Sequence, residues 1–190
     1  MEMLKKRILE EGHALNDQVL LVDSFLNHQV DPVLMQAVGE EFARRFADAG
    51  ITRVATIESS GIAPAVMTAL TMRVPLVIMK KSVSSILKDG ILQTEVFSFT
   101  KNASYQLTLK SKFVRPGDKV LLIDDFLANG CALLGLIDIV KKSGATLEGA
   151  GIVIEKGFQS GGQTIRDMGI HLESLAIIDS IADGKLTFRE

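Results

Sequence analysis

Short apolar runs alternate with helix-like segments along most of this chain, and this alternation is the feature that most restricts its fold. Two helical patterns, at residues 62–70 and about 130–143, separate neighbouring apolar runs. Strand, helix and strand at this spacing build parallel sheets with helices packed on their faces. We therefore predict an α/β fold with a central parallel sheet flanked by helices. The expected strands are residues 53–57, 75–79, 119–124, 147–154 and 171–178.

Two further helices are predicted before the first strand. An apolar stripe with helical spacing covers residues 1–8, and Gly12 is a plausible stop. Asp31 followed by Pro32 is typical of a helix start, because the carboxylate caps the first turn and proline fits the first helical position. We expect that second helix to end at Gly50.

The segment between the second and third strands has a different character. It is polar from residue 80 onward, and residues 104–109 then alternate between polar and apolar side chains. This pattern indicates a mobile loop followed by an antiparallel ribbon.

Composition excludes several classes of protein. Twenty-one Lys and Arg against 23 Asp and Glu give a net charge of −2, so there is no general electrostatic case for binding nucleic acid or a membrane surface. A single cysteine excludes an internal disulfide framework and a four-cysteine zinc site. Charges interrupt the apolar pattern of the N-terminal stretch, which is therefore neither a signal peptide nor a membrane span. A cytoplasmic location is the expectation.

The most informative residues follow the predicted strands, because ligands of such sheets bind outside the carboxyl ends of the strands. The carboxyl ends of the predicted strands form one edge of the sheet, and acids, lysines and glycines come together there. The segment at 128–132 also begins a helix, whose free N–H groups favour a phosphate. Two adjacent acids beside a phosphate site suit sugar hydroxyls or a hydrated divalent metal. The residues are Glu58 to Gly61, Lys80, Lys81, Asp124, Asp125, Ala128 to Ala132 and Glu155 to Phe158.

Four segments resemble a known family. VLLIDDFLANGCA, at 120–132, resembles the phosphoribosyl pyrophosphate (PRPP) motif of the type I phosphoribosyltransferases. The order of elements matches that family over roughly 120 residues, from Val54 to Ile178. The segments at 15–32, 58–70 and 151–159 resemble the xanthine phosphoribosyltransferases within it. In the phosphate loop, Asn129 and Ala132 replace the hydroxyl residues of most members, so binding there would depend more on backbone amides.

The resemblance implies a fold, a reaction and an assembly. One phosphoribosyltransferase domain would span residues 1–190, with an N-terminal hood segment and helix at 1–50, a core at 51–178 and a flexible loop and ribbon at 80–110. The hood would be completed by the C-terminus. The reaction would convert xanthine and PRPP to xanthosine 5′-monophosphate and pyrophosphate, with Mg²⁺ bound mainly through PRPP and pyrophosphate rather than by protein ligands. A homodimer is expected.

The resemblance also assigns roles to individual residues. Asp124 and Asp125 would bind the ribose hydroxyls and stabilise the positive charge at the reacting carbon. Lys88 would lie in the mobile loop that closes over the site. The residues expected to bind PRPP are Ala128, Asn129, Gly130, Cys131, Ala132, Ser59, Ser60, Gly61, Lys80 and Lys81; those expected to bind xanthine are Leu20, Asn27, Lys156 and Phe158.

Simpler structural interpretations exist for most of these residues. Adjacent acids after a strand are often a solvated turn, a Ser-Ser-Gly sequence is often a helix cap, and paired lysines are often solvated. Phe158 fits a core position equally well.

Other functions also remain open. A PRPP-binding purine regulator would carry the same domain, but residues 1–50 have five Lys and Arg against nine Asp and Glu, a poor match for DNA. Adenine, hypoxanthine or guanine are alternative bases. Lys156 can only donate hydrogen bonds, which favours a purine with an exocyclic oxygen.

Overall fold

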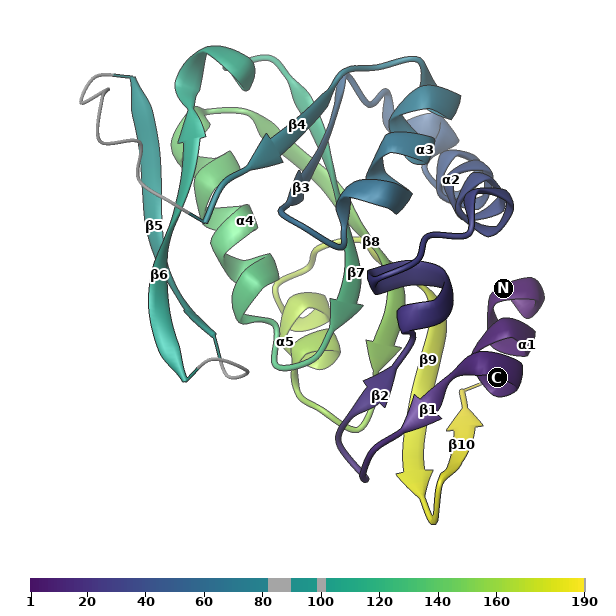
Figure 1. The fold of residues 1–190 in the computed structure, drawn as a ribbon. Coiled ribbons are helices and arrows are strands. Elements are labelled where there is room, and N and C mark those ends of the chain that lie inside the picture. The colour runs from purple at the N-terminus through teal and green to yellow at the C-terminus, as the bar shows by residue number, and fades with distance from the viewer. Residues whose placement is uncertain (82–89, 99–101, 190) are drawn as a thin grey trace.

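The computed structural model describes residues 1–81, 90–98 and 102–189, and its centre is a six-stranded sheet. The strand order is β10-β9-β8-β7-β3-β4, in which all neighbours are parallel except β10 and β9 (Figure 1). The predicted α/β fold with a central, mostly parallel sheet is confirmed. Its strands are β3 (Arg53–Ile57), β4 (Leu76–Met79), β7 (Lys119–Leu127), β8 (Thr146–Lys156), β9 (Leu172–Ala182) and β10 (Lys185–Phe188).

Helices cover both faces of this sheet. The first face packs against α1 (Glu2–Glu11), α2 (Pro32–Arg45) and α3 (Ile62–Met72), and the second against α4 (Cys131–Ser143) and α5 (Gly161–Asp167). Each face has its own hydrophobic core, called here the first core and the second core after the faces. In strand β7, Leu121 and Ile123 belong to the first core, and Val120 and Leu122 belong to the second. Successive side chains of a strand point to opposite faces, so a central strand must be apolar throughout.

The N-terminal helices largely follow the predicted signals. Helix α1 ends at Glu11 with Gly12 as its C-cap, and the Asp31 carboxylate accepts hydrogen bonds from two backbone N–H groups at the start of α2. Helix α2 ends at Arg45 instead of Gly50. A 3₁₀ turn, Ala47–Ala49, intervenes, and Gly50 then adopts a left-handed φ of 64°.

Strand β7 is longer than its apolar run suggests. It continues through Asp124 and Asp125 to Leu127, because residues 124 and 126 still pair with Ile152 and Ile154 of β8. The prediction that this strand ends at Asp124 is therefore wrong, because β7 continues three residues further to Leu127. Sheet pairing keeps the backbone extended where the side-chain pattern has already turned polar.

An antiparallel ribbon stands beside the second face of the sheet (Figure 1). It consists of β5 (Ile91–Ser98) and β6 (Ala103–Lys110), as the alternation predicts, and backbone hydrogen bonds between Lys80 and Thr108 join it to the end of β4. A 3₁₀ turn, Ser111–Phe113, follows. The loop predicted to be mobile, with Lys88, lies outside the described residues.

The two ends of the chain meet at one corner of the molecule. Helix α1 lies next to the β9–β10 hairpin in Figure 1, and Lys5 Nζ donates to the Arg189 carbonyl at 3.4 Å. The short pair β1 (His13–Ala14) and β2 (Leu20–Leu21) and a π-helical turn, Asp23–Asn27, lie in the same N-terminal segment. We refer to residues 1–27 together with the β9–β10 hairpin as the hood. Strand β10 and helix α5 were not predicted from the sequence. No helix in the described part of the chain has both the length and the apolar character needed to cross a membrane.

Candidate active site

Two adjoining cavities lie where β3 and β7 end. The acid cavity, of about 260 Å³, is lined by the turn after β3 together with Asp124 and Asp125. The loop cavity, of about 200 Å³, is lined by residues 128–132 and by the ribbon. Within residues 1–81, 90–98 and 102–189, three side chains line both cavities, which therefore form one continuous region. The shared residues are Lys81, Phe126 and Ala132.

The two carboxylates lie in a poorly solvated position. Asp124 is only 5% exposed, and the Asp125 backbone N–H donates to Asp124 Oδ1 at 3.0 Å. Burial raises the pKa of Asp124 well above its ordinary value, and the neighbouring Asp125 charge adds to this rise. Burial also raises the pKa of Asp125. This is not a solvated turn, and the pair is suited to a cationic or hydrogen-bonding ligand that replaces the missing water.

The turn after β3 is packed directly against Asp124. A methyl group on Gly61 would lie 2.7 Å from Asp124 Oδ1 and 2.5 Å from Thr56 Oγ1, so no larger residue fits there without displacing them. Ser59 and Ser60 line the acid cavity in the same turn. The structure thus brings the three residues predicted for pyrophosphate next to the predicted catalytic acid.

The loop between β7 and α4 has the geometry expected of a phosphate site. Gly130 has a φ of 87°, which favours glycine, and α4 begins immediately afterwards at Cys131. The first N–H groups of a helix have no partner within the helix and point outward. Behind the loop, the Gly161 N–H donates to the Ala128 carbonyl at 3.0 Å.

The two adjacent lysines have different surroundings. Lys80 Nζ pairs with Glu58 Oε2 at 3.0 Å and lines a separate cavity with Ile78 and Phe113. Lys81 lines both the acid cavity and the loop cavity, and its Nζ lies 5.6 Å from the centre of the Tyr105 ring. The structure places Lys81, more than Lys80, where it can contact a phosphorylated ligand.

Lys156 connects the end of β8 with the hood. Its Nζ donates to the Gln18 carbonyl at 2.7 Å and lies 5.7 Å from the centre of the Phe126 ring. Burial lowers the pKa of Lys156. Gln159 reinforces the connection, since its Nε2 donates to Gln18 Oε1 at 3.1 Å.

The other residues expected to bind a base lie in varied surroundings. Leu20 is buried in the first core, and Phe158 is half-buried against the same core. Asn27 is exposed at the end of the π-helical turn. Their roles in binding stay predictions.

Several residues of this region were not predicted from the sequence. Tyr105 and Phe126 line the loop cavity, and Gln18 contacts Lys156. Phe126 follows the two acids directly, so its position was a usable signal. No local pattern marks Tyr105 or Gln18, because the ribbon and the hood reach the site only through the tertiary fold.

The donor set fits a metal that is held mostly by a ligand. Asp124 and Asp125 are hard oxygen donors suited to Mg²⁺ or its waters. Across the described residues, no group of three or more His, Cys, Asp and Glu side chains is arranged to hold a metal. Substrate oxygens and water would have to complete the coordination.

Comparisons with known proteins identify the family to which this chain is similar. The model of the phosphoribosyl transferase domain matches residues 30–168. A xanthine phosphoribosyltransferase of Oceanobacillus iheyensis is 55% identical over 190 residues, covering 100% of this chain and 98% of that protein. One of Clostridium novyi is 51% identical over 189 residues, covering 100% of both chains.

Solved structures show the same fold at much lower identity. Adenine phosphoribosyltransferase from Rhodothermus marinus matches with a TM-score of 0.76 and 19% identity, covering 94% of this chain and 100% of that one. The enzyme from Thermoanaerobacter pseudethanolicus matches with a TM-score of 0.73 and 17% identity, covering 92% and 98%. At this identity the likeness concerns the fold alone.

Proposed function

This chain belongs to the phosphoribosyltransferase family, among the xanthine phosphoribosyltransferases, and we propose that it transfers the 5-phosphoribosyl group from PRPP to xanthine. The products are xanthosine 5′-monophosphate and pyrophosphate, a purine salvage reaction. The observation that carries this proposal is the continuity of the acid cavity and the loop cavity, with Asp124 and Asp125 in the first and the α4 N-terminus beside the second. Such a site suits a sugar that carries phosphates at both ends.

The two acids act on the sugar in this proposal. Displacement at the anomeric carbon passes through an oxocarbenium-like centre, and carboxylates held in a poorly solvated site stabilise developing positive charge strongly. Asp124 and Asp125 also accept hydrogen bonds from the ribose hydroxyls. Residues 128–132 bind the 5′-phosphate through backbone N–H groups, and Ser59 to Gly61 receive the pyrophosphate.

Charge neutralisation on the pyrophosphate comes from two sources. Lys81 lies between the two cavities and contributes a positive charge to either phosphate group. Mg²⁺, bound mainly by PRPP oxygens and water, would supply the rest of the positive charge when present. Lys80, paired with Glu58, holds the turn after β3.

The base is bound next to Lys156. An ammonium group has three donors, and the Gln18 carbonyl uses one of them, which leaves others for the exocyclic oxygen of xanthine. Leu20 and Asn27 in the hood face the other edge of the base in this proposal, and Phe126 or Phe158 stacks on its ring. Adenine carries an amino group where xanthine carries that oxygen, so a lysine donor disfavours adenine.

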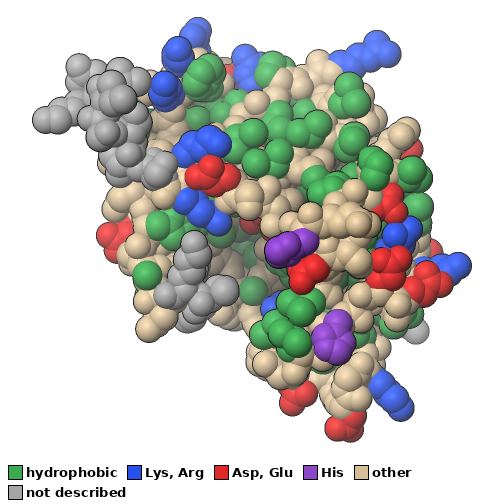
Figure 2. Space-filling view, in the orientation of Figure 1, with side chains coloured by type: hydrophobic (Ala, Val, Ile, Leu, Met, Phe, Trp, Pro, Cys, Tyr) green, Lys and Arg blue, Asp and Glu red, His purple; other side chains and the backbone are tan. Residues whose placement is uncertain are grey.

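The assembly and location are also proposals. Residues 1–190 act as one phosphoribosyltransferase domain in the cytoplasm. A homodimer is supported by exposed apolar side chains of α3, because Val66 and Leu70 of that helix are 42% and 69% exposed. Figure 2 shows hydrophobic side chains gathered over this part of the molecule. Large apolar groups clustered at a surface commonly mark an interface.

A turnover assay with four bases tests the proposed function. Purified protein, PRPP and Mg²⁺ are mixed with xanthine, hypoxanthine, guanine or adenine, and pyrophosphate release is measured. We expect the highest kcat/KM for xanthine and the lowest for adenine. Preference for guanine or hypoxanthine would overturn the choice of base but leave PRPP chemistry intact, whereas PRPP binding without turnover of any base would indicate a regulator.

A further inference from the structure

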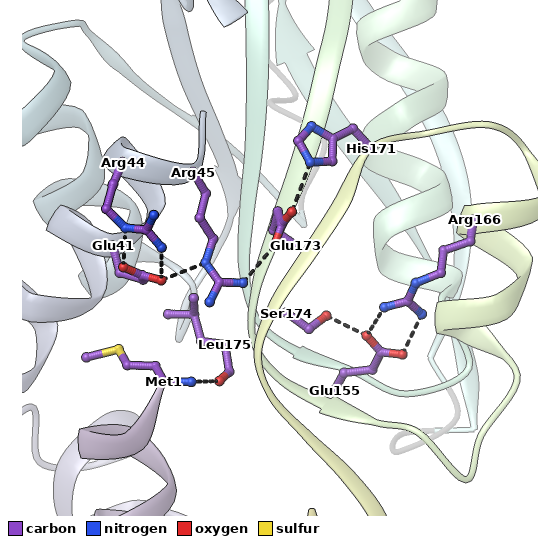
Figure 3. A network of polar contacts seen from close by, with 10 residues as sticks. All are labelled: Met1, Glu41, Arg44, Arg45, Glu155, Arg166, His171, Glu173, Ser174 and Leu175. Atoms are coloured by element: carbon purple, nitrogen blue, oxygen red, sulfur yellow. Dashed lines mark hydrogen bonds and ion pairs between the residues drawn. The ribbon is translucent and has the colours of Figure 1, made fainter. Parts of the chain in front are cut away.

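A buried carboxylate at the end of β8 joins three elements behind the phosphate loop. Glu155 is 1% exposed and accepts hydrogen bonds from both terminal nitrogens of Arg166, at 2.7 and 2.8 Å. It also accepts one from the Ser174 hydroxyl at 2.5 Å (Figure 3). The network therefore links β8, α5 and β9.

This network fixes α5 in place. A bidentate arginine–carboxylate pair sets both distance and orientation, so it restrains a helix more than a single contact does. Gly162 lies so close to Glu155 Oε1 that a methyl group on Gly162 would overlap it, and Ile165 of the same helix is fully buried in the second core. These contacts together restrain the position of α5.

Helix α5 in turn supports the phosphate loop from behind. The Gly161 N–H donates to the Ala128 carbonyl at 3.0 Å, and a methyl group on Gly161 would overlap that carbonyl and lie 2.7 Å from the Gly130 N. The backbone of α5 thus touches the backbone of the loop with no side chain between them. A shift of the helix must therefore shift the loop.

The charge of Glu155 is stabilised in this setting. Burial alone raises the pKa of Glu155, but the hydrogen bonds from Arg166 and Ser174 outweigh burial and lower it below the ordinary value. A buried carboxylate is costly unless it is paired, and three hydrogen bonds pair this one, so removing one of its partners or its charge should disturb the elements that it joins.

We propose that Glu155 is a positioning residue for PRPP: through Arg166 and α5 it holds the loop at 128–130 in the conformation that binds the 5′-phosphate. This inference rests on the proposed function. Glu155 lies directly before Lys156, so the strand end that positions the phosphate loop also carries the lysine assigned to the base.

The test replaces Glu155 by glutamine, which keeps the shape but removes the charge and one of the acceptors for Arg166. We expect the KM for PRPP to rise about tenfold or more, the Kd for ribose 5-phosphate to rise in parallel, and kcat and the KM for xanthine to change less than about threefold. Ribose 5-phosphate carries the 5′-phosphate without pyrophosphate or base, so its binding, measured by calorimetry, reports on the loop directly.

Glu173→Gln is the matched control. Glu173 lies on β9, as Ser174 does; it accepts a hydrogen bond from Arg45 at 2.6 Å and contacts His171 at 3.0 Å, and neither of these contacts reaches α5 (Figure 3). We expect this variant to lose thermal stability without a selective change in PRPP or ribose 5-phosphate binding. If Glu155→Gln weakens ribose 5-phosphate no more than the control does, Glu155 is only structural and the inference is wrong.

Two further variants remove smaller parts of the Glu155 network, so the size of the change in the KM for PRPP can be compared among them. Ser174→Ala removes one hydrogen bond but leaves the ion pair, so it should fold and raise the KM for PRPP by less than Glu155→Gln does. Arg166→Lys keeps the charge but loses the bidentate geometry, and an effect as large as that of Glu155→Gln is expected. An unchanged KM for PRPP in both would refute the inference even if Glu155→Gln failed to fold. Failure of the proposed function gives a different result, since wild-type protein would then not turn over xanthine, whatever the variants do to the binding of ribose 5-phosphate.

Discussion

At the scale of single residues, the chemistry depends on Asp124 and Asp125. We expect Asp124→Asn combined with Asp125→Asn to lower kcat/KM on the order of a thousandfold or more, because the contacts that stabilise the transition state are lost. Turnover of xanthine and PRPP at saturating Mg²⁺ measures this. Activity within tenfold of wild type would show that the acids do not carry the reaction.

The same double variant should keep its thermal stability, so that a loss of activity can be assigned to catalysis and not to unfolding. Burial raises the pKa of both carboxyls above the ordinary 3.8. The protonated carboxyls therefore favour the folded state. This contribution to the free energy of unfolding is complete below the ordinary pKa and is lost as the pH rises through the raised pKa values of the folded protein. The amides do not titrate, so at pH 8 the variant should melt at the same temperature as wild type or higher. A fall in Tm across the whole pH range would mean that lost activity reflects misfolding.

At the scale of elements, the start of α4 offers an independent test. Cys131 is the first residue of that helix, is partly exposed and lines the loop cavity. If residues 128–132 bind the 5′-phosphate, PRPP with Mg²⁺ should slow alkylation of Cys131 by iodoacetamide several-fold or more. It is the chain's single cysteine, so mass spectrometry reads one site. Equal labelling rates with and without PRPP would count against the phosphate-loop assignment, and a Cys131→Ser variant provides the unlabelled control.

At the scale of the whole molecule, the hood brings the N-terminal segment to the end of β8. The bond from Lys156 Nζ to the Gln18 carbonyl joins residues 138 positions apart. In this setting Asn27 is the residue proposed to face the second carbonyl of xanthine and its adjacent N–H, since an amide both donates and accepts. Asn27→Leu should weaken xanthine by roughly 1–3 kcal/mol, the cost of an unpaired polar group, and hypoxanthine by much less.

The measurement is the ratio of kcat/KM for xanthine and hypoxanthine in wild type and variant. Asn16→Leu provides a control. The Asn16 side chain accepts hydrogen bonds from two backbone N–H groups of its own turn, so this substitution alters the hood at a residue with no proposed contact to the base. An unchanged ratio in Asn27→Leu, or an equal change in both variants, would exclude Asn27 from base recognition.

The sequence by itself determined the elements whose signals are local. Strand β3 spans the predicted residues 53–57, and Asp31 caps α2 as its side chain and the following proline predict. Apolar periodicity, caps and left-handed glycines act over a few residues, so they can be interpreted without knowing the fold. The PRPP motif at 120–132 belongs to the same class, since acids and phosphate loop lie on one continuous segment.

Only the tertiary structure decided how separate segments meet. It extended β7 through the acids by pairing with β8, placed Lys81 rather than Lys80 between the two cavities, and connected Lys156 to the hood. The Glu155 network and the support that α5 gives to the loop belong here as well. These contacts depend on packing between residues far apart in the chain, where no local pattern fixes the partner. The free energy of burying and pairing polar groups is therefore settled by the assembled fold, not by any one segment.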